Sequence, residues 1–434
     1  MSLMNEHGFP QGWIEQLRPL LGDELSDFLR ALNEPPLRGV RTRKGIVPPS
    51  EAEEKVPWGE DAYYLPLDSD AGIRPAHEAG AYYLQEPSAM TAAAALRPLP
   101  GDRVLDLCAA PGGKSTQLAA MMAGEGTLVC NEPVPGRAQV LSRNLERMGV
   151  KNAVAVCALP EDLSPRWQGF FDKILVDAPC SGEGMFRRHP ETRAEWTPAA
   201  PEGCSRRQAH ILRHAAAMLR PGGRLAYSTC TFNAIENEGV IETFLKEHPD
   251  FHLVPFSLPG LPACTGMLRV WPHLVKGEGH FAALLEKEGE AQKKQAVFSL
   301  PSPGKNECAL ARAFLREHIA EEVTVNALFA GKIIFAPEEL PPLQGVRVLR
   351  LGLQIGEVKG KIFLPDHALA LACPSLRTIP ITEEQARAYQ AGQVLPISEA
   401  LRGFYALTLD GLNLGWGKAS EGQLKNHYPK GLRK

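Results

Sequence analysis

A series of five short apolar runs, with helical patterns between most of them, constrains the fold of this chain more than any other feature. The runs cover residues 103–107, 127–132, 152–158, 171–177 and 224–231. Strands that alternate with helices form a parallel sheet with helices on both faces. Two later runs, 251–256 and 280–285, have little helix between them and predict an antiparallel pair at one edge. The predicted fold class is therefore α/β, with a Rossmann-like doubly wound core.

The rest of the chain divides into candidate domains on either side of this core. We expect an N-terminal domain at 1–75, the core domain at 76–288, a middle domain at 295–375 and a C-terminal domain at 376–434. In the first of these, apolar residues recur at helical spacing from Trp13 to Leu32, which predicts one helix that ends before Pro35. The C-terminal domain is rich in glycine and short strand signals, whereas the middle one carries no motif.

Composition and cysteine spacing exclude several classes of protein. The 434 residues carry a net charge of −3, and the chain has no membrane-spanning apolar run and no signal-peptide pattern. No two of the nine cysteines have the CxxC spacing of a zinc knuckle. An odd number of cysteines without a signal peptide indicates reduced thiols. We therefore expect a monomeric cytoplasmic protein with no metal and no membrane partner.

The segment after the first strand, residues 106–115 (DLCAAPGGKS), has the small residues of a nucleotide-binding loop. The helix that follows offers free backbone N–H groups to an anionic group. Cys108 stands where the phosphate-binding GxxxxGK[ST] motif requires glycine, and GxGxxG is not matched either, so an ATPase is disfavoured. Glu132 ends the second strand, where a doubly wound fold holds ribose hydroxyls, although it could instead cap the next helix.

An adenosine cofactor without a diphosphate, such as S-adenosylmethionine, fits this loop and the acidic residue after the second strand. The helix that begins at residue 136 adds a basic side chain near the same strand end. The residues expected at the cofactor are Cys108, Ala109, Ala110, Pro111, Gly112, Gly113, Lys114, Glu132, Arg137 and Asp177.

Two cysteines follow two of the predicted strands, within residues 177–182 (DAPCSG) and 228–231 (STCT). If these strands are neighbours, both thiols face one crevice at the carboxyl ends of the sheet. A thiolate can attack C6 of a pyrimidine, which makes C5 nucleophilic enough to accept a methyl group. Asp177 can hold the N3/N4 edge of a cytosine, and the second thiol can remove the C5 proton or release the adduct. The residues alone leave open whether Cys180 or Cys230 attacks.

Several motifs together resemble those of a known family, the RNA cytosine-C5 methyltransferases of the NOL1/NOP2/Sun family. The segments that carry the resemblance are 106–114, 177–182 and 228–231. Further segments are similar to bacterial members that act on 16S ribosomal RNA, namely 182–188, 271–273, 277–281 and the tail at 415–433. The match extends over most of the chain and is weakest at 295–375.

The resemblance implies a methyltransferase that uses S-adenosylmethionine and acts on ribosomal RNA or the small ribosomal subunit. It implies that Cys230 is the nucleophile, that Cys180 assists product release and that Asp177 holds the base. It also implies a small α+β domain at the N-terminus and a PUA-like RNA-binding domain at 376–434.

Basic residues in two places are candidates for contact with RNA. Arg187 and Arg188 follow Cys180 closely and could meet phosphates near the target, or could form surface salt bridges with Glu191 or Glu195. From residue 415 to the end, five Lys or Arg stand against one Glu, interleaved with Trp and Tyr, which suits a nucleic-acid face or a solvated tail. The lysines concerned are Lys418, Lys425 and Lys430.

One departure from the family pattern supports a rival function. The family commonly has Asn or Asp after the third strand, near the cofactor adenine, whereas this chain has Cys157 or Leu159 there. Glu161, Asp162 or backbone groups are the alternatives. A non-catalytic RNA-binding ribosome assembly factor that retains the fold is the rival. A methyltransferase for exocyclic amines is disfavoured, because such a site requires an aromatic residue that stacks on the base, and Cys180 occupies that position.

Overall fold

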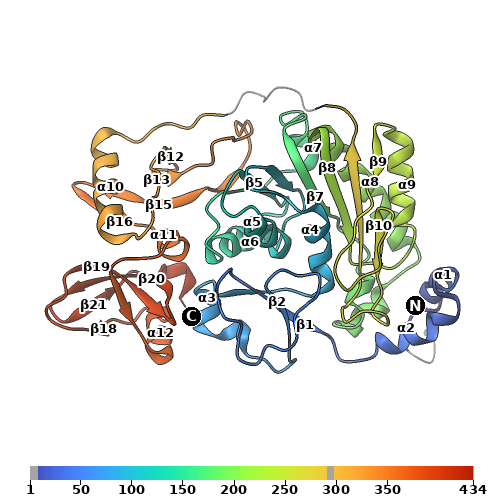
Figure 1. Cartoon of the computed structure of the whole chain (residues 1–434), viewed down its shortest axis with the longest axis horizontal. Coiled ribbons are helices and arrows are strands. Elements are labelled where there is room, and N and C mark those ends of the chain that lie inside the picture. Colours follow the sequence, from blue (N-terminus) through green and yellow to red (C-terminus); the bar gives the residue numbers. More distant parts are fainter. Residues whose placement is uncertain (1–7, 291–297, 434) are drawn as a thin grey trace.

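The computed structural model describes residues 8–290 and 298–433, and Figure 1 shows their arrangement around a central nine-stranded sheet. Along the sheet the order is β10 (Met267–Val270), β11 (His280–Lys287), β8 (Leu219–Thr229), β7 (Phe171–Asp177), β4 (Arg103–Asp106), β5 (Thr127–Asn131), β6 (Ala153–Val156) and β14 (Val348–Leu351), with β9 (Phe251–Leu253) beside β11. Strands β8, β7, β4, β5 and β6 are parallel, whereas β11 and β14 flank them in the antiparallel sense. The predicted doubly wound core is confirmed, as is the antiparallel pairing of β9 with β11.

The direction in which the parallel strands are added reverses at β4. Strands β5 and β6 follow on one side of it, and β7 and β8 on the other. Ligands of open α/β sheets bind at such a switch point, outside the carboxyl ends of the strands. Asp106 ends β4 and Asp177 ends β7, so the loops that follow these residues border the crevice.

Alternate residues of each strand pack on opposite faces of the sheet, as the two-residue period of a strand requires. Val104 and Leu128 share a core with α4 (Thr91–Leu96), α5 (Gly113–Met121) and α6 (Pro135–Arg147). Leu105 and Val129 share the other core with α8 (Ala199–Met218) and α9 (Glu238–Glu247). Both faces of the sheet are therefore covered, which explains the nearly continuous apolar strands.

A segment beyond residue 300 completes one of these two cores. Helix α7 (Pro160–Leu163) has only four residues, where a doubly wound fold usually has a long crossover helix. Ile334, Leu340 and Leu351 pack in the same core as Val129, and β14 pairs with β6 at the sheet edge. The segment expected as a separate middle domain thus contributes both a strand and core residues to the central sheet.

The N-terminal segment forms two distinct parts. One helix was expected from Trp13 to Leu32, and this is wrong: α1 (Gln11–Leu21) and α2 (Leu25–Ala31) are separated by the 3₁₀ turn Gly22–Glu24. The break occurs because Gly22 adopts φ +50° and ψ −120°, a conformation open mainly to glycine. The second part is a sheet in the order β2 (Ala62–Leu65), β1 (Arg38–Thr42), β3 (Tyr82–Leu84), followed in the chain by α4 and adjoined by α3 (Pro75–Glu78).

Two smaller sheets lie toward the C-terminus (Figure 1). The first contains β12 (Ala327–Phe329), β13 (Lys332–Phe335), β15 (Leu353–Lys359) and β16 (Ile362–Pro365), with α10 (Lys305–His318) and α11 (His367–Ala372). The second has the order β17 (Thr378–Pro380), β19 (Gly403–Leu409), β20 (Leu412–Ser420), β21 (Gln423–Asn426) and β18 (Leu395–Pro396), with α12 (Glu383–Gln390). Among the described residues, no helix has the length and apolar character needed to cross a membrane.

Candidate active site

The two cysteine loops lie side by side at the carboxyl end of the sheet. Strands β7 and β8 are parallel neighbours, and Asp177 is in register with Ser228. The sulfurs of Cys180 and Cys230, 50 residues apart in the sequence, are 3.4 Å from each other. The condition set by the sequence, that the two strands be neighbours, is met.

The carboxylate of Asp177 is held from several sides at this strand end. It accepts hydrogen bonds from Lys114 Nζ at 2.8 Å and from Ser228 Oγ at 2.7 Å. Burial alone would raise the pKa of Asp177, but the Lys114 ammonium and these hydrogen bonds outweigh it and lower the pKa below its usual value. Lys114 in turn has its pKa raised, because the charge of Asp177 outweighs the effect of burial. The pair is therefore ionised at neutral pH.

A histidine that motif analysis did not assign to the site adjoins this pair. His280 Nε2 lies 3.7 Å from Asp177 Oδ1, and the side chain is buried. Neither ring nitrogen has a hydrogen-bond partner among the described residues. Burial and the nearby Lys114 charge lower the pKa of His280 to about 3, so its imidazole is neutral.

The contact between the two sulfurs affects the protonation of Cys180. The hydrogen bond with the Cys230 sulfur, together with burial, raises the pKa of Cys180 well above its usual value. Cys180 is therefore a neutral thiol at neutral pH, able to donate its S–H to the neighbouring sulfur.

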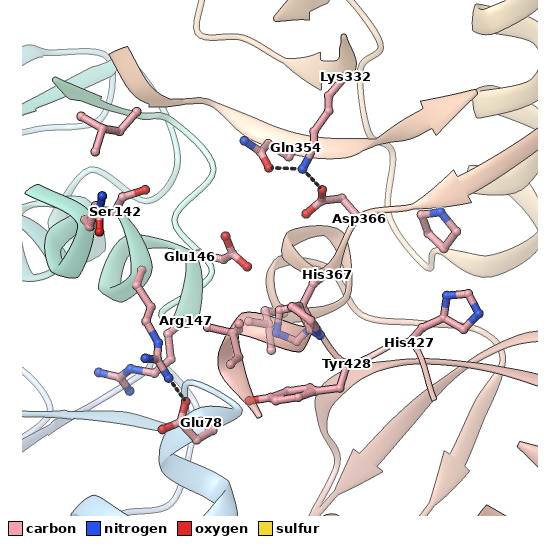
Figure 2. A pocket seen from close by; sticks show the side chains of 18 residues that line it. Glu78, Ser142, Glu146, Arg147, Lys332, Gln354, Asp366, His367, His427 and Tyr428 are labelled. Carbon is pink, nitrogen blue, oxygen red and sulfur yellow. Dashed lines mark hydrogen bonds and ion pairs between the residues drawn. The ribbon is translucent and has the colours of Figure 1, made fainter. Parts of the chain in front are cut away.

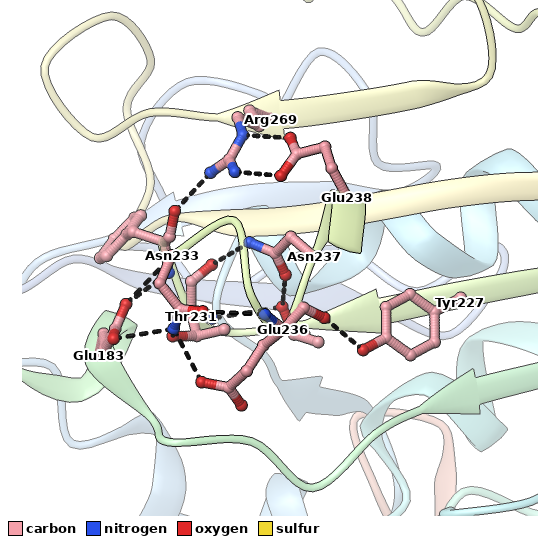
Figure 3. A network of polar contacts seen from close by, with 10 residues as sticks. Glu183, Tyr227, Thr231, Asn233, Glu236, Asn237, Glu238 and Arg269 are labelled. Carbon is pink, nitrogen blue, oxygen red and sulfur yellow. Dashed lines mark hydrogen bonds and ion pairs between the residues drawn. The ribbon is translucent and has the colours of Figure 1, made fainter. Parts of the chain in front are cut away.

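A buried polar network fastens the two cysteine loops to each other (Figure 3). Glu183, just after the first loop, accepts from the backbone N–H groups of Phe232 and Asn233 at 2.9 and 3.0 Å. Glu236, after the second, accepts from the Ser181 N–H at 2.9 Å and from Asn233 Nδ2 at 2.8 Å. Each carboxylate thus binds the backbone of the opposite loop, which fixes the separation of the sulfurs.

Glycine at position 184 is required for this close approach of the loops. The Gly184 N–H donates to the Cys230 carbonyl at 2.7 Å. A Cβ at this position would lie 2.6 Å from the same carbonyl oxygen, closer than real contacts allow. Any side chain here would push the loop that follows Cys180 away from Cys230.

A small cavity of about 190 Å³ opens next to this site, at the switch point of the sheet. Its lining includes Asp106, Lys114 and Asp177 and the loop from Cys108 to Pro111. Asp106 is fully buried, and its Oδ2 accepts a hydrogen bond from Ser115 Oγ at 2.6 Å, whereas its Oδ1 has no hydrogen-bond partner in the part of the chain that the structure describes. Burial raises its pKa to about 7. An unpaired buried carboxylate oxygen in a cavity is suited to a cationic or hydrogen-bond-donating ligand.

Of the other predicted cofactor residues, Gly113 also lines this cavity, whereas Gly112, Glu132 and Arg137 are not part of its lining. Gly112 has φ +113°, and a Cβ added at Gly113, the first residue of α5, would lie 3.3 Å from the Tyr83 ring, so both positions favour glycine. Glu132 is buried after β5, and it accepts from the Val134 N–H at 3.0 Å and lies 3.4 Å from Arg137 Nη1. Arg137 also donates to the Ala110 carbonyl at 3.0 Å. Arg137 therefore links the loop after β4 to the acidic residue after β5.

Five residues that precede α4 line the cavity without having been predicted as site residues. They are Tyr83, Leu84, Gln85, Glu86 and Ala89. Arg41 of β1 joins them indirectly, because its Nε donates to Gln85 Oε1 at 3.2 Å. The sequence does show aromatic and polar residues just before the first core helix, which could have marked them as site candidates. Their closeness to β4, however, depends on the tertiary fold.

The segment after β6, where the family pattern is not followed, lies beside the acidic strand end. Cys157 Sγ is 3.5 Å from the Pro133 carbonyl oxygen, and the Ala158 N–H donates to Asn131 Oδ1 at 3.2 Å. Val134 and Leu159 are 48% and 49% exposed, so both present apolar surface to solvent. Glu161 instead contacts His210, with 3.4 Å between Oε2 and Nε2.

The two arginines after Cys180 make contacts that neither sequence alternative anticipated. Arg187 donates to the Glu34 carbonyl at 3.2 Å, and Arg188 donates to the Leu37 carbonyl at 2.7 Å. They hold the segment between α2 and β1 against the active-site loops. Helix α2 packs there as well, with Phe28 edge-on to Phe232 at 4.9 Å between ring centroids.

The basic tail presents lysines but not the aromatic residues expected among them. Lys418 and Lys425 pair across β20 and β21, and Lys430 is exposed in the following turn. Trp416 and Tyr428, in contrast, are 1% and 3% exposed and belong to the cores of this part of the chain. The interpretation of these two aromatics as part of a nucleic-acid face is corrected, because neither ring is accessible for stacking.

A larger cavity, of about 610 Å³, lies between α6, the middle segment and the C-terminal sheet (Figure 2). Its charges are mixed: Lys332 pairs with Asp366, and Arg143 lies 3.7 Å from Glu78. Because the cations are matched by carboxylates, this cavity has no excess charge to select a phosphate.

The fold and the site together define a class of protein, the Rossmann-like methyltransferases with a two-cysteine loop pair. The chain matches the profile of the 16S rRNA methyltransferase RsmB/F family at residues 93–286. Three further matches are to the N-terminal domain of RsmF at 9–87, its first C-terminal domain at 313–373 and its PUA domain at 376–434. The chain belongs to the RsmB/F family of 16S rRNA methyltransferases.

Relatives and solved structures agree with this assignment. "Ribosomal RNA small subunit methyltransferase F" of Klebsiella pneumoniae is 32% identical over 98% of this chain and 96% of its own length. The protein of the same name from Erwinia tasmaniensis is also 32% identical, over 100% of this chain and 98% of its own. A methyltransferase homologue from Pyrococcus horikoshii matches 64% of this chain and 99% of its own, with 28% identity and a TM-score of 0.53. NSun6 from the same organism, at 22% identity, matches 66% and 100% with a TM-score of 0.58, which shows the shared fold.

Proposed function

We propose that the protein methylates C5 of a cytosine in 16S ribosomal RNA, with S-adenosylmethionine as donor and a covalent bond between Cys230 and C6 of the base. The observation that supports this most directly is the pair of sulfurs 3.4 Å apart beside an ionised Asp177. Exocyclic amine methylation has no use for two thiols in contact. Pyrimidine C5 methylation uses a thiol both to activate the ring and to free the product.

The residues around the small cavity fit the proposed cofactor. The unpartnered Oδ1 of Asp106 suits the ammonium of its amino-acid part, and buried Glu132 suits the ribose hydroxyls. We place the adenine between Val134 and Leu159, whose exposed apolar side chains would be covered by the ring. Apolar contact there replaces the polar residue that the family commonly has. When bound, S-adenosylmethionine supplies an electrophilic methyl group.

In the proposed reaction, the Cys230 thiolate forms a bond to C6, and the electron pair of the C5–C6 double bond moves toward C5. Asp177 holds the N3/N4 edge of the base, and its ionised carboxylate can accept the N4–H. Once C5 carries the methyl group, the Cys180 sulfur, as thiolate, takes the C5 proton, the electron pair of the C5–H bond restores the C5–C6 double bond, and the S–C6 bond breaks to return the Cys230 thiolate. Cys180 acts at this last stage because the hydrogen bond between the two sulfurs, which raises the pKa of Cys180, is lost once Cys230 is bound to C6.

The target base must leave its stack to reach a site at the end of the sheet. We propose that Lys418, Lys425 and Lys430 of the C-terminal domain contact the RNA backbone at a distance from this site. Arg187 and Arg188 are proposed to order the segment near Glu34 and Leu37 at the rim, where phosphates of the target strand would pass.

The proposal is tested with single cysteine variants on small-subunit RNA. Cys230→Ala is expected to reduce methylation by at least about 10³-fold, because no thiolate remains to attack C6. Cys180→Ala is expected to accumulate an RNA–protein adduct that survives denaturing electrophoresis, because the product cannot leave. Cys308 on α10, which packs against the core of the C-terminal sheets and not against the central sheet, gives the matched control Cys308→Ala, which should neither lose activity in this way nor trap RNA.

Two outcomes would contradict the proposal. If Cys230→Ala trapped the adduct and Cys180→Ala were inactive without one, the roles of the thiols would be reversed. If calorimetry showed no binding of S-adenosylmethionine to the wild-type protein, the enzymatic assignment of the cavity would fail.

A further inference from the structure

A cluster of metal-ligating side chains lies outside the active site, where helix α7 meets α8. It consists of Glu161, His210 and His214. Their ligand atoms all lie within 4.8 Å of one another, and His210 Nε2 is 3.4 Å from Glu161 Oε2. We propose that these three residues bind a divalent transition-metal ion, with Zn²⁺ as the best fit.

The positions of the two histidines in the sequence favour joint coordination. His210 and His214 are four residues apart in α8, so both side chains emerge on the same face of the helix. Their rings lie 4.6 Å apart between centroids and meet edge to face. Glu161 reaches the same point from α7, 49 residues earlier in the chain, so the ligands come from two rigid elements rather than from one mobile loop.

One of the histidines also has its second ring nitrogen in a hydrogen bond that fixes the orientation of the ring, as metal-binding histidines in proteins usually do. His214 Nδ1 lies 2.7 Å from Ser164 Oγ, at the end of α7. When Nδ1 carries the proton and donates to this hydroxyl, the lone pair of Nε2 is left for a metal. A ring that is held in one orientation loses less freedom on binding.

The donor set selects the kind of ion. Two imidazole nitrogens and a carboxylate oxygen suit Zn²⁺, whereas Mg²⁺ and Ca²⁺ prefer oxygen ligands alone. Tetrahedral zinc with bonds of about 2.0–2.1 Å needs ligand atoms roughly 3.3 Å apart, which the His210–Glu161 distance already matches. Small rotamer changes would bring in His214, and water would complete the coordination on this exposed surface. The nearby Arg213 is engaged with Glu247 at 3.0 Å, so its charge is compensated.

The site would join α7 to α8 and thereby stabilise the short helix that replaces a long crossover. The sequence predicted no metal because the cysteines lack CxxC spacing, but the His-x₃-His spacing on α8 carries the signal instead. This site is separate from the proposed methyl transfer, and its test does not depend on activity.

The experiment is a zinc titration of the full-length, chelator-treated protein against a chromophoric competitor, with Co²⁺ as a second probe. We expect one Zn²⁺ per chain with a dissociation constant in the micromolar range or below. The double variant His210→Ala/His214→Ala should weaken this binding at least about tenfold, and Glu161→Gln should weaken it less. The matched control His252→Ala removes another exposed histidine that lies near a glutamate, and it should bind as the wild type does.

The cysteine pair is the competing zinc site, and the cobalt spectrum separates the two. A thiolate-to-cobalt charge-transfer band that the double histidine variant retains would assign the ion to Cys180 and Cys230 and would overturn the proposal. So would the absence of zinc binding to the wild type, or equal affinity in the double variant. His210 and Glu161 are exposed to 48% and 43%, and His214 is partly buried, so all three lie at the surface and not in a core; the circular dichroism spectra of the variants should match the wild-type spectrum.

Discussion

At the scale of single residues, Asp106 shows how the fold changes the chemistry of a side chain. Its position after the first core strand suggests an ordinary acidic strand end. In the structure it is fully buried, and burial raises its pKa from 3.8 to about 7. It is one of the few groups in the site whose charge changes near neutral pH, and the unfolded chain does not share this property.

Asp106→Asn is predicted to become progressively more stable than the wild type as pH rises. Between about pH 4 and pH 7 the native wild-type protein binds more protons than the unfolded chain, so its free energy of unfolding falls as pH increases. Above pH 7 Asp106 is charged in both states, and the full loss of stability caused by the buried charge is present. Asparagine carries no charge and can still accept from Ser115. The cost is at most about 4 kcal/mol, from roughly 1.4 kcal/mol per pKa unit.

Thermal unfolding at pH 5 and pH 8 measures this difference. The difference in Tm between the variant and the wild type should be several degrees larger at pH 8 than at pH 5. Asp68→Asn, at an exposed carboxylate, should show a constant offset. A gap for Asp106→Asn that does not widen with pH would contradict the raised pKa.

At the scale of elements, the loops that follow β7 and β8 are held together by contacts of their own, beyond the pairing of the two strands. Strands β7 and β8 alone place Cys180 and Cys230 in the same region. The distance of 3.4 Å between their sulfurs depends on Glu183, Glu236 and the close approach of Gly184. These residues act by positioning the thiols and have no contact with the sulfurs' reacting lone pairs.

Glu236→Ala is predicted to destabilise the protein by about 2–4 kcal/mol and to reduce activity without removing either thiol. The Ser181 N–H, Gln208 Nε2 and Asn233 Nδ2 would each lose a buried acceptor. Glu242→Ala, at an exposed position of α9, is the matched control and should change the free energy of unfolding by less than about 0.5 kcal/mol. Denaturant unfolding and single-turnover methylation measure the two effects, and wild-type values for Glu236→Ala would show that the network is dispensable.

At the scale of the whole molecule, the domains expected from the sequence are joined more closely than their boundaries suggest. Strand β14 extends the central sheet beyond β6. Arg350 on this strand is 2% exposed and donates to Glu146 of α6 at 2.9 Å. Arg43 of the N-terminal part donates to the Leu371 carbonyl at 3.0 Å. The outer parts of the chain therefore pack on the catalytic core.

A fragment that ends at residue 288 is predicted to be unstable and prone to aggregate, although it contains every proposed catalytic residue. Removal of the residues after 288 would expose the edge of β6 and the apolar surface that Ile334, Leu340 and Leu351 cover in the full chain. Light scattering and thermal unfolding of this fragment, compared with the full chain, measure the effect. A monomeric fragment with the Tm of the full chain would show that the later strand and core residues contribute nothing to the sheet.

The sequence by itself determined the doubly wound core, the loop at Cys108–Lys114 and the two cysteine segments. These signals are local: strand and helix periods, small residues at a turn, and short motifs at strand ends. Tertiary structure decided the rest, including the burial of Trp416 and Tyr428, the position of His280 beside Asp177, and the insertion of β14 into the central sheet. Burial and long-range pairing depend on segments far apart in the chain, and no local pattern records which of them meet.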